Sequence, residues 1–140
     1  MKKTIEFVQE REKGAIPMST EQNKAVLGRW LEGFNKGNAD LQVALADEIY
    51  TTDFIGHGFG PSLDDVKQFV RMVLTNAPGN GVTVDDLIAE GDKVVARFTV
   101  RGKDPSTGQP AHFLVISIGR FTSGKIAEVW QLMMSGESPW

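Results

Sequence analysis

The sequence predicts an α+β domain in which helices cover one face of an antiparallel sheet. In the first half of the chain apolar residues recur at helical spacing, whereas from Val82 onwards they alternate with a period of two. Because the helical segments precede the extended ones, the pattern favours a helical layer packed on an antiparallel sheet. The chain has 140 residues, 41% hydrophobic and 24% charged, which is the composition of one globular domain.

Three helices are expected. The first begins after Ser19, which has capping-box spacing to Gln22, and it ends near Gly37, where glycine tolerates the left-handed conformation. The second follows with a predicted buried face of Leu41, Ala44, Leu45 and Ile49. After a short strand at residues 53–57, the third helix begins at Ser62 with a predicted buried stripe of Val66, Phe69, Val70, Val73 and Leu74.

A meander of four strands is predicted for the second half, at residues 82–89, 93–101, 112–121 and 125–134. The third of these strands is apolar on both alternating sets, so we expect both of its faces to be covered. Alternation predicts that the face turned towards the helices carries Val115, Ser117, Val129 and Gln131. Ser117 and Gln131 are either ordinary members of a hydrophobic core or the polar groups of a cavity.

Composition and charge exclude several classes of function. The net charge of −3 gives no electrostatic footprint for nucleic acid, so no nucleic-acid partner is expected. The absence of cysteine and the presence of only two histidines, His57 and His112, argue against a metal site. No apolar stretch approaches the length of a membrane span or a signal peptide. We therefore expect a cytoplasmic protein with no membrane association, no metal and no other cofactor.

The domain is expected to cover residues 19–135, between an arm at residues 1–18 and a tail at residues 136–140. The arm is charge-rich and ends next to Pro17. It is either disordered, as termini often are, or it packs Ile5, Phe7 and Val8 onto another apolar surface.

The outer face of the predicted sheet leads to a prediction about assembly. If Val115 and Ser117 face the helices, alternation turns six large side chains to the far side: Leu114, Ile116, Ile118, Ile126, Trp130 and Leu132. Monomers rarely leave contiguous apolar patches of more than a few hundred Å² exposed to water. Because a two-fold interface needs only one self-complementary surface, we predict a homodimer through this face.

Four segments together resemble a known family: NKAVLGRWLEGFNKGNADL, TTDFIGHG, VDDLIAEGDKVVARFTVRGKDPSTG and IGRFTSGKIAEVWQLM. They are similar, in order and spacing, to the SnoaL-like polyketide cyclases of the nuclear-transport-factor-2-like (NTF2-like) superfamily. The resemblance covers roughly residues 20–134. It implies a cone, in which a curved antiparallel sheet wraps over three N-terminal helices and encloses an apolar pocket that opens at one end. It also implies a dimer through the sheet.

The resemblance also suggests site residues. His57 in DFIGHG matches a histidine that SnoaL-like sequences commonly place at the pocket. Ser117, Val129, Gln131 and Gly58 stand where members of the superfamily carry an acidic residue or a histidine, so every acidic position that can be carried over is neutral here. The implied pocket wall consists of Trp30, Phe34, Phe98, Phe113, Val115, Val129 and Met133.

Two functions remain open at the level of sequence. In the first, the protein binds a small apolar molecule and is catalytically silent, because the family acids are replaced. In the second, it is a cyclase, isomerase or hydrolase in which His57 exchanges protons with a carbonyl or ring-containing metabolite, oriented by Ser117 and Gln131. A hydroxyl such as that of Ser117 needs an adjacent base to act in catalysis, and His57 is the candidate.

Overall fold

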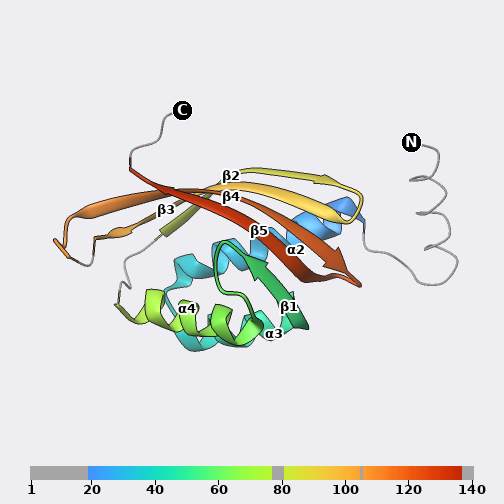
Figure 1. Ribbon diagram of the computed structural model, residues 1–140, viewed down its shortest axis with the longest axis horizontal. Helices are drawn as coiled ribbons and strands as arrows, with labels where there is room; N and C mark the ends of the chain where they lie inside the picture. Colours follow the sequence, from blue (N-terminus) through green and yellow to red (C-terminus); the bar gives the residue numbers. More distant parts are fainter. Residues whose placement is uncertain (1–18, 77–80, 105, 137–140) are drawn as a thin grey trace, which may run out of the picture.

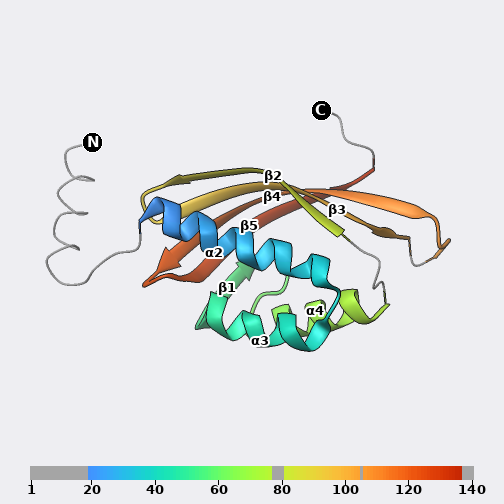
Figure 2. The ribbon, with the colours of Figure 1, turned by 180° about the vertical axis from the view of Figure 1, so that it is seen from behind.

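The computed structural model describes residues 19–76, 81–104 and 106–136, in which a layer of helices lies under one face of a curved sheet (Figures 1 and 2). The elements are α2 (Thr20–Gly33), a 3-10 turn η1 (Phe34–Lys36), α3 (Ala39–Ile49), β1 (Tyr50–His57), α4 (Leu63–Asn76), β2 (Gly81–Glu90), β3 (Lys93–Lys103), β4 (Pro110–Thr122) and β5 (Lys125–Ser135). The predicted α+β class and its three helices are confirmed. The predicted arm at residues 1–18 lies outside the described residues, as does the tail beyond Gly136. None of the described helices combines the length and apolar character needed to cross a membrane.

The sheet has the strand order β1-β5-β4-β3-β2. Strands β2 to β5 form the predicted antiparallel meander. Strand β1 joins the sheet by pairing with β5 in parallel, so the sheet is mixed rather than wholly antiparallel. As a result, the segment before α4 becomes an edge strand beside β5 (Figure 1).

The first helix starts where the sequence predicts, whereas α2 itself ends at Gly33 and the turn η1 continues the chain to Gly37. The Ser19 hydroxyl accepts a hydrogen bond from the Gln22 amide at 3.1 Å, and the Gln22 side chain accepts one from the Ser19 amide at 2.8 Å. Gly37 ends η1 with a φ of 66°, in the left-handed region. Local chemistry therefore fixes the start of α2 and the end of the turn that follows it.

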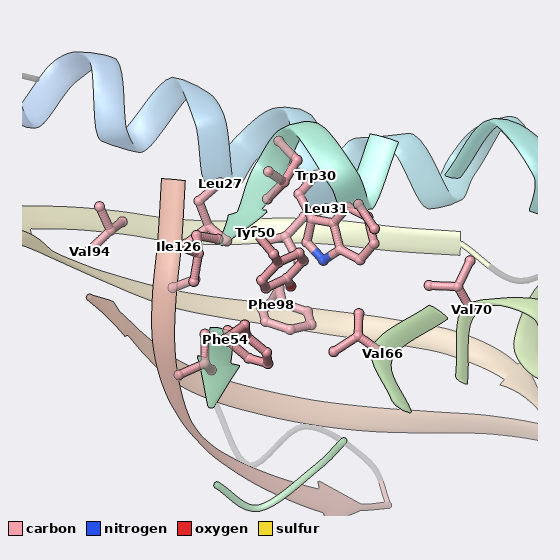
Figure 3. Close-up of a cluster of buried hydrophobic side chains, with 14 of the residues drawn as sticks. Leu27, Trp30, Leu31, Tyr50, Phe54, Val66, Val70, Val94, Phe98 and Ile126 are labelled. Carbon is pink, nitrogen blue, oxygen red and sulfur yellow. The ribbon is translucent and has the colours of Figure 1, made fainter. Parts of the chain in front are cut away.

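The hydrophobic core lies between the helices and the inner face of the sheet (Figure 3). Helix α4 buries Val66, Val70 and Leu74, but Phe69 of its predicted stripe is 41% exposed. The face predicted for α3 was also partly wrong. Leu41 is 60% exposed, and the helix instead buries Gln42, Ala46 and Ile49. This difference arises because α3 packs against α2, α4 and β1, so its neighbours rather than its strongest apolar stripe set its orientation.

A β-bulge in β5 changes which residues face the core. Arg120 pairs with Glu128, whereas the next residue, Phe121, pairs with Ile126, so β5 carries one extra residue at Ala127. A bulge reverses the alternation of side chains on one side of it. Ile126 is consequently fully buried in the core, and the prediction that it lies on the outer face was wrong.

Candidate functional site

The predicted inner polar pair is present. Ser117 on β4 lies directly opposite Gln131 on β5, between the pairs Val115–Met133 and Gly119–Val129. Ser117, Val115 and Val129 are buried, and Gln131 is half-buried. The register predicted for this hairpin is therefore confirmed, and a hydroxyl and an amide sit together on the face that the helices cover.

An aromatic cluster lies over the inner face. The rings of Trp30 from α2 and Tyr50 from β1 meet edge to face with centroids 5.2 Å apart. Phe54 continues the cluster at 4.7 Å from Tyr50, and Phe34 contacts Trp30 at 5.3 Å. Figure 3 shows Trp30, Tyr50 and Phe98 grouped between α2 and the sheet. Burial raises the pKa of the Tyr50 hydroxyl far above its usual range, so this side chain is protonated at all physiological pH values.

The polar chemistry of this interior is neutral. Within the described residues, the buried polar or charged residues are Asn23, Gln42 and Ser117. The Gln42 amide donates to the Trp30 carbonyl oxygen at 2.8 Å, which ties α3 to α2. Hence the described inner face offers hydroxyl and amide hydrogen bonds but no buried carboxylate or imidazole.

His57 does not lie with Ser117 and Gln131. In the parallel β1–β5 ladder it is level with Trp130, and its ring stacks on the Trp130 indole with centroids 5.5 Å apart and planes 12° apart. Since Trp130 and Gln131 are neighbours on one strand, their side chains point to opposite faces. His57 therefore lies on the outer face, and the expectation that it serves the same cavity as Ser117 is corrected. No local pattern predicts this placement, because it depends on the parallel pairing of β1 with β5.

On that outer face His57 belongs to a polar cluster. Its Nε2 atom lies 2.7 Å from Oε2 of Glu128, whose other oxygen accepts from Arg120 at 3.2 Å. The hydrogen bond with His57, followed by that with Arg120, lowers the pKa of the Glu128 carboxyl below its usual value. The arrangement ties β1, β4 and β5 together at the edge of the sheet.

The residues predicted to form the pocket wall divide into two groups. Trp30, Phe98, Val115 and Val129 belong to the buried core, against which Phe34 packs. Phe113 is only half-buried, and Met133 is 55% exposed. A hollow of about 450 Å³ begins at Phe113, next to Ser135 at the end of β5. None of the other predicted wall residues lines that hollow.

A larger groove of about 850 Å³ lies elsewhere, between α2 and α3. Its floor includes Gly28 and Leu45, and its rim carries Arg29 and Glu48, which form an ion pair at 2.8 Å. It contains none of the site residues predicted from the sequence. We therefore place the candidate site on the inner face of the sheet rather than in this groove.

Comparison with known proteins supports the same fold. The family model described as a SnoaL-like domain matches residues 27–129. A search among curated proteins gives no match. Among solved structures, IdmH from Streptomyces antibioticus, a candidate polyketide cyclase, is similar with a TM-score of 0.67 and 22% identity, over 80% of this chain and 91% of its own.

Two further solved structures show comparable similarity. AclR from Streptomyces galilaeus, a candidate hydroxylase, has a TM-score of 0.70 and 21% identity, over 83% of this chain and 91% of its own. SalBIII, an epoxide hydrolase/cyclase-like enzyme with a role in pyran ring formation in the polyether salinomycin, has a TM-score of 0.66 and 14% identity, over 81% of this chain and 92% of its own. At these identities the likeness shows the fold alone.

Proposed function

The chain belongs to the SnoaL-like domain family, and on that premise we propose that it binds a small apolar molecule on the inner face of its sheet. The observation that carries the proposal is the Ser117–Gln131 pair, two facing polar side chains among Val115, Val129 and Met133. Ligand sites of this kind are mostly apolar, with a few placed polar groups that fix orientation. The exposed Met133 and half-buried Phe113 mark the end of the inner face from which a ligand would reach the pair.

We favour binding without catalysis over the enzymatic alternative. General acid–base catalysis requires a group that exchanges protons near neutral pH within reach of the substrate. In the described interior the buried polar groups are amides, the Ser117 hydroxyl and the Tyr50 hydroxyl, whose pKa burial raises, and His57 lies on the other side of the sheet. This distribution supports a binding protein. A cytoplasmic site of action stays a prediction from the sequence.

Two neighbouring methionines allow a matched test. Met133 lies on the inner face and Met134 on the outer face, and the two have similar exposure, 55% and 51%. A neutral fluorescent probe, N-phenyl-1-naphthylamine, is titrated into the wild type, Met133→Glu and Met134→Glu. A charge at the opening of an apolar site disfavours the probe, so we expect Met133→Glu to weaken binding about tenfold or more, and Met134→Glu about twofold or less. Equal effects of the two variants, or no saturable binding by the wild type, would contradict the proposal.

We also propose that the outer face of the sheet pairs with a second copy of the chain. The exposed apolar residues at its centre, here called the outer stripe, are Ile116, Ile118, Trp130 and Leu132. Figures 1 and 2 show the described helices on the opposite side of the sheet. Leu114 shares the register of this face but is 4% exposed, so it adds little free surface.

The size and charge of this face support a second copy as its partner. Five strands about 4.8 Å apart, each about ten residues long at about 3.3 Å per residue, span roughly 800 Å². A standard interface buries about 800 Å² on each partner. The charges beside the stripe are paired within one copy, Arg97 with Asp86 at 2.6 Å and Arg120 with Glu128. When two copies pair through this face, each copy therefore presents an apolar centre whose neighbouring charges are already neutralised within that copy.

A further inference from the structure

The imidazole of His57 lies against the outer stripe, the surface proposed above to pair with a second copy. It stacks on the indole of Trp130, which belongs to that stripe, with the ring planes 12° apart. Its Nε2 atom contacts Oε2 of Glu128 at 2.7 Å. The stack and the hydrogen bond hold the ring from two sides, and its side chain is 47% exposed in a single copy. A second copy on this face therefore removes the imidazole from water without displacing it.

The net charge of the cluster around His57 depends on the protonation of this ring. The guanidinium of Arg120 contacts the other oxygen of Glu128 at 3.2 Å and balances the carboxylate. Because the pKa of the Glu128 carboxyl is lowered, first by its hydrogen bond with His57, it stays ionised at weakly acidic pH. A carboxylate only accepts, so Nε2 carries the proton of the neutral ring and a second proton enters at Nδ1. The cluster is then neutral with a neutral imidazole and carries one net positive charge with an imidazolium.

The charged groups beside His57 come from the strands of the sheet. They are Glu128 on β5, Arg120 on β4, Lys93 on β3, which is opposite Arg120 in the ladder and bonds to Asp92, and Asp53 on β1 itself. Helices α3 and α4 also contact β1, but from the opposite side of the sheet (Figure 1). Imidazole is the side chain that ordinarily changes its charge between about pH 5 and pH 8. His57 is therefore the group of this cluster that responds to a change of pH in that range.

We propose that protonation of His57 weakens the pairing of two copies through the outer face, so that assembly responds to pH. This inference rests on the dimer proposed above and names how that interface is regulated. A two-fold interface brings the same cluster from each copy to one apolar surface. Since moving an unbalanced imidazolium out of water is unfavourable, the free copy binds the proton more readily than the dimer. By linkage, acid shifts the equilibrium towards free copies.

The sign of the effect separates it from general charge repulsion. The chain has a net charge of −3 at pH 7 with both histidines neutral, and protonation of both brings it to −1. Repulsion between two copies therefore decreases in acid, which by itself would tighten the dimer. The local cluster at His57 predicts the opposite, a dimer that weakens in acid.

The two histidines of the chain provide a matched test. Sedimentation velocity over a concentration series gives the dimer Kd of the wild type, His57→Gln and His112→Gln at constant ionic strength. Because each dimer excludes two protons, the wild-type Kd should rise about tenfold or more from about pH 7.5 to about pH 5.5. Glutamine keeps an N–H donor for Glu128 but gains no charge, so the Kd of His57→Gln should change about twofold or less. His112, opposite Arg101 at the other end of β4, is the control, and its variant should behave as the wild type.

Each outcome decides between the switch and the dimer on which it rests. A wild-type Kd that is constant or falls in acid overturns the switch and leaves the dimer intact. A wild type that is monomeric at every pH and concentration removes the dimer and the switch together. Loss of the pH dependence in His112→Gln, with its retention in His57→Gln, assigns the effect to the other histidine and overturns this inference. His57→Asn is measured alongside, with circular dichroism at both pH values, so that a folding defect of one variant does not decide the result.

Discussion

The imidazole of His57 lies nearly parallel to the indole of Trp130, with ring centroids 5.5 Å apart, on the face of the sheet that no described helix covers. The same imidazole contacts the Glu128 carboxylate at 2.7 Å. A histidine that the sequence places at a cavity is therefore part of the outer surface. Its neighbours on that surface are the apolar residues of the outer stripe. We therefore expect His57 to affect the association of two copies rather than catalysis.

We expect the protein to sediment as a dimer, and Trp130→Glu or Ile116→Lys to shift it to monomer or aggregate. Each variant buries an unpaired charge in an apolar interface, which typically costs several kcal/mol. Leu41→Lys is the control, because Leu41 is 60% exposed on α3, away from the sheet, and should leave the dimer intact. A wild-type monomer at micromolar concentration would show that the outer stripe is not an interface between copies.

The Glu128 carboxyl should contribute to acid stability. Its pKa is lowered in the folded protein, first by the hydrogen bond with His57 and then by Arg120. A lowered folded pKa gives stability that is present above the ordinary value and is lost as pH falls through the folded value. The wild type should have a higher Tm than Glu128→Gln at neutral pH, and this difference should shrink as pH falls below about pH 4.5. Glu48→Gln, in the exposed pair with Arg29, is the control and should show a smaller effect. A Tm difference that grows on acidification would contradict this account.

The sole tyrosine, Tyr50, should titrate only when the protein unfolds. Burial raises its pKa in the folded state, while the unfolded chain ionises it near about pH 10. Above that pH the unfolded state loses the proton and the folded state keeps it, so folding stability falls as pH rises. Near-ultraviolet absorbance should show no tyrosinate in the native protein below about pH 11. Between about pH 9 and pH 11, the Tm of Tyr50→Phe should fall less than the Tm of the wild type. Ionisation of native Tyr50 near pH 10 would mean that the hydroxyl is solvated.

Gly58 should not tolerate a side chain. It has a φ of 89°, and a Cβ atom there would overlap the backbone carbonyl oxygen of Gln131. Gly58→Ala should lower the free energy of unfolding by about 2 kcal/mol or more in urea titrations, from backbone strain together with the contact. Gly91→Ala is the control, since φ is 61° there and nothing lies within 4 Å, so it should cost about 1 kcal/mol. If both substitutions lowered the free energy of unfolding by similar amounts, backbone strain alone would explain the loss, without a contribution from the contact with Gln131.

Local sequence determined the elements and the inner face of one hairpin. Period-two alternation identified β2 to β5, and the turn residues Ser123 and Gly124, both with positive φ, close a two-residue loop that fixes how β4 and β5 pair. That pairing sets Ser117 opposite Gln131. The two strands of a hairpin are close in sequence, and the turn between them sets their register. Sequence pattern and turn chemistry were therefore sufficient to predict that Ser117 and Gln131 share the inner face.

Contacts between distant segments decided the rest. The parallel pairing of β1 with β5 joins residues more than seventy positions apart, His57 and Glu128 among them, and no local period encodes that partner. The extra residue at Ala127 turns Ile126 to the inner face of the sheet, but it does not interrupt the apolar pattern of the sequence. Tyr50 begins β1 directly after α3, and its packing against Trp30 from α2 places its ring in the core. Alternation specifies which residues share a face within one strand, whereas the partner strand and its register determine what that face meets.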